Sequence, residues 1–77
     1  MNKARRQELE KAINLIEEAN SLIECVKDEE EGAYANLPEG LQMSERGEQM
    51  EENVDSLDEV ICSIEDVLST LDDVMNG

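Results

Sequence analysis

The sequence predicts an all-α fold, an antiparallel hairpin of two long helices, from three observations. Residues 57–77 consist of three seven-residue units, each with an aliphatic residue, two acids and then two adjacent apolar residues. Such heptads are typical of an α-helix with one apolar face and one acidic face. Residues 9–26 also place apolar residues at helical spacing, and the only proline lies between the two stretches. No segment alternates polar and apolar residues for long enough to indicate a β-strand.

The first helix is predicted over residues 3–35. Asn2 can cap it, because a side-chain oxygen at that position accepts a hydrogen bond from a free backbone N–H. Pro38 should end the helical stretch, since proline disfavours helical geometry at the residue before it. The apolar line of this helix, in steps of three and four residues, is Leu9, Ala12, Ile16, Ala19, Ile23 and Val26, widened by Ile13, Leu15 and Leu22.

The second helix is predicted over residues 44–75, after a loop at 36–43. Ser44 is its expected N-cap. In the loop, Leu37, Leu41 and Met43 are expected to cover the end of the core. The apolar line of the second helix is Met50, Leu57, Ile64 and Leu71, flanked by Val54, Ile61, Leu68 and Met75 and by Val60, Val67 and Val74.

Charges at the two chain ends support the antiparallel arrangement. Three bases, Lys3, Arg5 and Arg6, stand at the positive end of the first helix dipole. Asp72 and Asp73 stand at the negative end of the second. Each group is unfavourable for its own helix, and an antiparallel hairpin brings the two groups together so that they offset each other.

The two cysteines are expected to remain reduced. In a hairpin closed at residues 36–43, Cys25 should lie near residue 54 and Cys62 near residue 17. This offset of about eight residues corresponds to ~12 Å along the helices. A disulfide requires Cα atoms within about 7 Å, so an intrachain bond is not expected.

The 77 residues are expected to form one domain, residues 1–77, that associates further. Two helices that pack only on each other need a narrow apolar line, and these stripes are wider. The sequence therefore predicts a homodimer whose two hairpins form a four-helix bundle. The oligomer core is predicted at Ile16, Ile23, Leu57, Ile61, Ile64, Leu68 and Leu71.

The net charge is −15, and it is unevenly distributed. Residues 1–27 carry five acids and five bases, whereas residues 28–77 carry sixteen acids and Arg46 as their one base. Direct binding to nucleic acid or to an anionic membrane is not expected from such a chain. A basic protein surface is the expected partner, and imitation of the charge pattern of nucleic acid is one way to bind it. The candidate partner-binding residues are Glu48, Glu51, Glu52, Asp55, Asp58, Glu59, Glu65, Asp66, Tyr34, Leu37 and Arg46.

Catalysis is not expected. The chain has no histidine, which removes the usual general base and the histidine ligands of a di-iron bundle. The acidic run beside Gly32 does not fit a calcium loop, because Lys27 and Pro38 would fall at its two end ligands. No metal or other cofactor is predicted. No apolar stretch reaches the roughly 20 residues of a membrane span, and no secretory signal is recognised, so the cytoplasm is the expected location.

The segment between the helices resembles a known group of proteins. The residues that carry the resemblance are Asp28-Glu29-Glu30, Tyr34, Asn36-Leu37-Pro38-Glu39, Leu41-Gln42, Ser44 and Arg46-Gly47. This pattern is similar to small uncharacterised proteins encoded by phages and prophages of Gram-positive bacteria, in which a similar segment joins two acidic helices. The resemblance implies a phage accessory protein that acts in the infected host cell. It also implies a specific role for Arg46 and Gly47.

Three functions follow as hypotheses. The first is an inhibitor that covers a basic surface of a bacterial defence nuclease or its complex. The acids of the second helix would steer and orient the protein, and the segment from Tyr34 to Met43 would anchor it. The second is a structural coiled-coil adaptor whose partner is another helix. The third is an antitoxin-like protein that neutralises a basic toxin.

Overall fold

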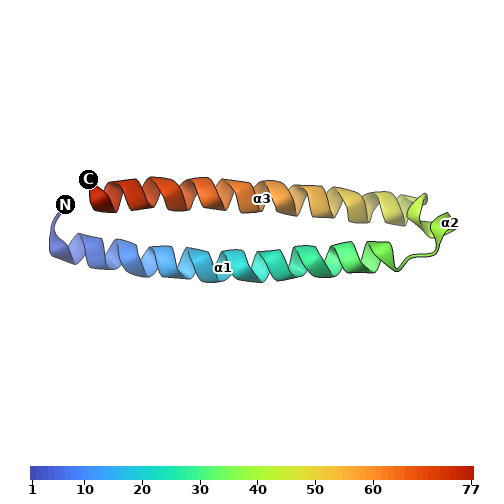
Figure 1. The fold of residues 1–77 in the computed structure, drawn as a ribbon, viewed down its shortest axis with the longest axis horizontal. Helices are drawn as coiled ribbons and strands as arrows, with labels where there is room; N and C mark the ends of the chain where they lie inside the picture. The colour runs from blue at the N-terminus through green and yellow to red at the C-terminus, as the bar shows by residue number, and fades with distance from the viewer.

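The computed structural model describes residues 1–77 and consists of helices without strands. Helix α1 spans Lys3–Ala35, the short helix α2 spans Glu39–Gln42, and α3 spans Glu45–Asn76. α1 and α3 lie side by side and run in opposite directions, and the two chain termini lie at the same end (Figure 1). The molecule measures 58 × 15 × 13 Å. The all-helical prediction is confirmed, and the molecule has the shape of an extended helical hairpin.

Both predicted N-caps are present. Asn2 Oδ1 accepts a hydrogen bond from the Arg5 backbone N–H at 2.8 Å, and Ser44 Oγ accepts one from Gly47 N–H at 3.4 Å. Each cap therefore satisfies an N–H that the first helical turn leaves without an intrahelical partner. Neither long helix contains a stretch apolar enough to cross a membrane.

The seam between α1 and α3 differs from the line expected on α1. Ala19 and Val26 were expected in the seam, but both are exposed, Val26 by 52%. Asn20 and Lys27 take their places. The half-buried residues of α1 that form the line are Leu9, Ile13, Ile16, Asn20, Ile23, Lys27, Glu30 and Tyr34. The predicted and the observed line of α1 share Leu9, Ile16 and Ile23. Only the observed line continues to Tyr34, near the end of the helix.

On α3, the seam contains the apolar residues at the first and fifth positions of each heptad. They are Met50, Val54, Leu57, Ile61, Ile64, Leu68, Leu71 and Met75. Ile61 is the one apolar side chain that is buried, at 7% exposure. The seven residues predicted for the oligomer core all lie in this seam between α1 and α3.

Two contacts define the register of the hairpin. Lys27 pairs with Asp58 and Tyr34 with Glu51, and in each pair the residue numbers add to 85. By the same rule Cys25 is level with residue 60, which lies close to Cys62 in α3. The expected offset of about eight residues between the two cysteines was therefore wrong. Both thiols are nevertheless free and exposed. The shift arises because the chain reverses around α2 and Ser44 and not midway through residues 36–43.

α2 forms the closed end of the hairpin by packing on the first turn of α3. Gly47 is buried there, and an added Cβ would lie 2.7 Å from the Leu41 carbonyl oxygen and closer still to that of Gln42. The Gln42 side chain donates hydrogen bonds to the carbonyl oxygens of Tyr34 and Leu37, both at 3.2 Å. Met43, expected to cover the core, is 84% exposed. Gln42 and Gly47, rather than Met43, hold this end together.

The misplaced charges lie at the same end of the hairpin, but no ion pair joins the two groups. The ion pairs within 4.0 Å are Lys11–Glu8, Lys27–Glu31 and Lys27–Asp58. None of them joins Lys3, Arg5 or Arg6 to the aspartates of the last α3 turn.

Asn20 is a polar residue in an otherwise apolar part of the seam, and its Oδ1 atom is buried without a hydrogen-bond partner. A buried unpaired acceptor costs about 1–3 kcal/mol. We expect Asn20→Leu to raise the free energy of unfolding by about 1–2 kcal/mol, measured by urea denaturation. Asn14→Leu, a substitution at an exposed α1 position, serves as the control. A lower stability for Asn20→Leu than for the wild type would contradict the unpaired environment of Asn20.

Candidate partner-binding surface

The heptad geometry gives the hairpin two chemically different long sides. Each residue advances about 100° around a helix, so the residues before and after a seam position lie on opposite sides of the seam. On α1, Leu15 precedes and Glu17 follows Ile16. Leu22 and Glu24 stand in the same relation to Ile23. Apolar residues therefore occupy one side and acids the other.

The acids on one side form a surface that we call the acidic flank. Lys27 Nζ contacts Asp58 Oδ1 at 3.0 Å and Glu31 Oε1 at 3.9 Å, which places carboxylates of both helices on the same side of the seam. Glu51 joins them through its bond with Tyr34. The other members recur from these at seven-residue intervals. The acidic flank consists of Glu10, Glu17, Glu24 and Glu31 on α1 and Glu51, Asp58, Glu65 and Asp72 on α3.

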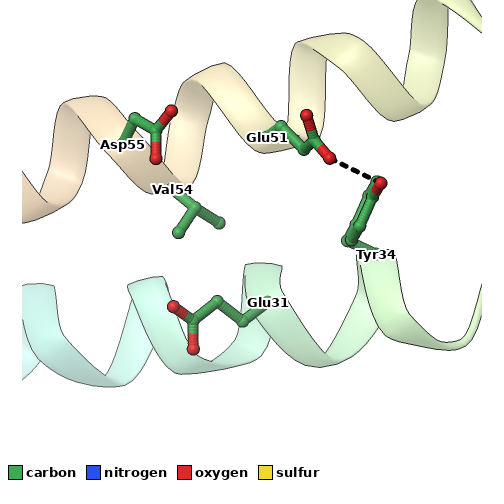
Figure 2. A pocket seen from close by; sticks show the side chains of 5 residues that line it. All are labelled: Glu31, Tyr34, Glu51, Val54 and Asp55. Carbon is green, nitrogen blue, oxygen red and sulfur yellow. Dashed lines mark hydrogen bonds between the residues drawn. The ribbon is translucent and has the colours of Figure 1, made fainter. Parts of the chain in front are cut away.

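A groove opens on the acidic flank near the closed end of the hairpin, lined by Glu31, Tyr34, Glu51, Val54 and Asp55. Tyr34 Oη donates a hydrogen bond to Glu51 Oε1 at 2.6 Å (Figure 2). Figure 2 also shows Glu31 on the α1 side of the groove and Asp55 on the α3 side. Three carboxylates beside an aromatic ring can receive an ammonium or guanidinium group, through charge-assisted hydrogen bonds and a cation–π contact.

Two hydrogen bonds between α1 and α3 raise the pKa of their donors, Tyr34 and Lys27. The hydrogen bond to Glu51 raises the pKa of Tyr34 above its ordinary 10.0, and desolvation acts in the same direction. The hydrogen bond to Asp58 raises the pKa of Lys27 above 10.5, with smaller contributions from the charges of Asp58, Glu31 and Asp28 against an opposing desolvation. Both contacts therefore stabilise the hairpin fully below the ordinary pKa values. Their contribution is lost as pH rises through the raised values.

Tyr34 is the only aromatic residue, so its titration is directly visible in the ultraviolet absorbance of the tyrosinate form. We expect Glu51→Gln to lower the pKa of Tyr34 towards 10.0, because the negative charge that favours the protonated phenol is removed. Glu52→Gln removes the same charge from the next residue, which does not contact Tyr34, and should shift the pKa much less. Equal shifts in the two variants would contradict the Tyr34–Glu51 contact.

The predicted partner-binding residues do not form one continuous surface. Glu51, Asp58 and Glu65 lie on the acidic flank. Glu48 and Asp55 lie three residues before Glu51 and Asp58 and border it. Tyr34 lines the groove and Leu37 is half-buried at the closed end. The acids that point outward, away from α1, are Glu52, Glu59 and Asp66.

Arg46 does not join this surface. It is exposed and lies seven residues before Asn53, whose side-chain amide contacts Glu30 on the opposite side of the seam. The half of the acidic flank on α1 is absent from the predicted set, in which every acid belongs to the second helix. The signal was present in the sequence, because Glu10, Glu17 and Glu24 each follow an apolar residue of the seam by one position.

The structure contains no group of three or more cysteine, aspartate or glutamate side chains arranged to hold a metal ion. Comparisons with protein-family models, curated proteins and solved structures give no match to this chain.

Proposed function

We propose that this protein binds a basic surface of another protein through its acidic flank. The observation that carries the proposal is the arrangement of eight carboxylates along one side of the hairpin, four on each helix, of which Glu31 and Asp58 pair with Lys27. Carboxylates recur about every 10 Å on each helix, since seven residues rise 1.5 Å each. Two such rows resemble the two phosphate rows that a basic nucleic-acid-binding groove receives.

The groove at Tyr34 gives this surface a specific contact in addition to its charge. A lysine or arginine side chain of the partner enters between Glu31, Glu51 and Asp55 and stacks on the Tyr34 ring. The long-range charge accelerates association, and the groove fixes the position of the bound partner. Binding should therefore weaken as ionic strength rises, because salt screens the exposed charges.

The resemblance to phage proteins narrows the proposed target to a component of a bacterial defence system, such as a nuclease or its complex. The protein acts in the infected cell as a homodimer in which two hairpins form a four-helix bundle. The dimer is supported by the width of the apolar stripes and by six of the nine exposed large apolar side chains, which lie along α1 and α3.

The experiment is a phage-infection assay in hosts that carry different defence systems, with and without this gene. The proposal expects restored plating in at least one defended host, together with salt-sensitive co-purification of a basic defence protein. Unchanged plating in every defended host would overturn the defence role. Co-purification that is insensitive to salt would overturn binding through the acidic flank.

A helical adaptor remains the second candidate, because the side opposite the acidic flank is apolar. It expects charge changes on α3 to leave activity intact and a polar substitution at Ile64 to abolish it. An antitoxin-like function would instead appear as protection from a basic toxin encoded beside this gene.

A further inference from the structure

The side of the seam opposite the acidic flank carries a continuous apolar surface. The Asn53 amide contacts Glu30 there at 2.9 Å, and Val60, Val67 and Val74 follow Asn53 at seven-residue intervals. We name this surface the apolar flank. It consists of Leu15, Leu22 and Val26 on α1 and Val60, Val67 and Val74 on α3, and each of these side chains is 43–66% exposed.

We infer that the apolar flank is the interface between two copies of this chain, with α1 of one copy lying on α3 of the other. This inference rests on the proposed homodimer and assigns its surface and orientation. Three observations support it: the area that the hairpin leaves exposed, the absence of charge on this side, and the alternation of large and small side chains.

The exposed area is larger than a compact chain of this mass leaves open. The hairpin exposes 5719 Å². A compact monomer of 8.6 kDa exposes about 4,700 Å², which is about 1,000 Å² less. A stable interface of standard size buries about 800 Å² on each partner. One such interface accounts for most of the excess.

The apolar flank is uncharged over its whole length. On this side, α1 presents Ala12, Leu15, Ala19, Leu22 and Val26, and α3 presents Ser56, Val60, Ser63, Val67, Thr70 and Val74. Charged residues return only at the two ends, with Arg5 and Glu8 beyond one and Glu29, Glu30 and Arg46 beyond the other. In a chain of net charge −15, this is the side on which a second acidic copy can approach with least repulsion.

Large and small side chains alternate in opposite order on the two helices. On α1, the row nearer the seam contains the small Ala12 and Ala19, and the outer row contains Leu15 and Leu22. On α3, valines occupy the row nearer the seam, and the outer row is small and polar.

A second copy rotated by 180° about the long axis places α1 over α3. By the register of the hairpin, Leu22 is then level with Ser63 and Leu15 with Thr70, so each leucine of one copy meets a small residue of the other. Both acidic flanks face outward on opposite sides of the dimer, where each can bind a basic partner.

The first test measures the solution mass of Leu22→Gln/Val67→Gln by light scattering over a range of concentrations. These side chains are exposed in the single hairpin, so its helicity should remain, as followed by circular dichroism. We expect a wild-type mass of twice 8.6 kDa and a dimer dissociation constant raised roughly 100-fold or more in the variant, because four apolar side chains leave the interface. Ser21→Gln/Ser69→Gln changes exposed residues off this flank and should keep the wild-type mass.

The outcomes distinguish a failure of the apolar flank as the interface from a failure of the proposed dimer. A wild-type monomer at all concentrations would overturn both this inference and the proposed dimer. A dimer whose dissociation constant is unchanged by Leu22→Gln/Val67→Gln would overturn the flank alone. Salt-sensitive binding to a basic partner is measured separately and depends on the acidic flank.

The second test traps the orientation in a chain with Cys25→Ser and Cys62→Ser. Leu22→Cys/Ser63→Cys should give a covalent dimer on mild oxidation, because residues 22 and 63 of different copies meet at the interface. Leu15→Cys/Leu22→Cys should not, since α1 does not meet α1. Covalent dimers from the second variant and not from the first would overturn the orientation.

Discussion

Gly47→Ala should lower the free energy of unfolding by about 2–3 kcal/mol, because the added methyl group has no space. A Cβ at residue 47 would lie 2.6 Å from the Gln42 carbonyl carbon and 2.7 Å from the Leu41 oxygen, both backbone atoms of the closed end. Backbone cannot move aside as a flexible side chain can, so α2 must shift away from α3. Urea denaturation followed by circular dichroism measures the loss.

Gly32→Ala provides the matched control, since it makes the same substitution in the other long helix. A Cβ at Gly32 meets no atom within 4 Å, and the residue is exposed within α1. Alanine favours the helix by about 0.5–1 kcal/mol over glycine, so this variant should be more stable than the wild type. Effects of the same sign in the two variants would contradict the packing of α2 on the first turn of α3.

Ile61→Ala should lower the free energy of unfolding by about 2–4 kcal/mol. Ile61 is the one buried apolar side chain of the hairpin and lies near the middle of α3, where the seam cannot collapse as easily as at a helix end. The loss combines the transfer of the removed methyl and methylene groups to water with the cavity that remains. Thermal and urea unfolding should both report it.

Cys62→Ala tests the adjacent residue. The Cys62 side chain is exposed, so its removal should change the free energy of unfolding by less than about 0.5 kcal/mol. If Ile61→Ala and Cys62→Ala had equal effects, the assignment of the seam on α3 would be wrong.

The helices themselves could be predicted from local chemistry. Asn2 and Ser44 cap the helices as expected, and the heptads of residues 57–77 place Leu57, Ile61 and Ile64 in the seam. The caps and the heptad spacing depend on residues that are only a few positions apart in the sequence, so they can be predicted without knowledge of the tertiary structure. The all-helical class of the fold follows from them.

The register and the seam of α1 could not be predicted in this way. The apolar face of α1 is wide enough for two lines, and the choice of Asn20 over Ala19 depends on which α3 residues lie opposite. That in turn depends on α2, a single helical turn within the expected loop, and on the close contact that only Gly47 permits. The close approach of α2 to the first turn of α3 gives Gly47 a structural role.

The two-sided character of the hairpin required both helices in register. Considered alone, residues 1–27 carry no net charge, and the five acids of this segment look balanced by its five bases. Once the seam is fixed, Glu10, Glu17 and Glu24 join the acids of α3 on one side, while most of the bases lie near the N-terminus. The acidic flank is therefore a property of the pair of helices and not of either sequence repeat.

The most direct test of the central claim compares two fourfold variants of α3 in the phage-infection assay. The first neutralises the flank acids Glu51, Asp58, Glu65 and Asp72 to the corresponding amides. The second neutralises the acid that follows each of them, namely Glu52, Glu59, Asp66 and Asp73. Each variant therefore loses two glutamates and two aspartates, the first from the acidic flank and the second from the outward face. Circular dichroism verifies that both variants remain helical. If the acidic flank is the binding surface, the first variant should lose protection and the second should retain most of it. Equal loss in both would show that net charge alone matters and would contradict the account.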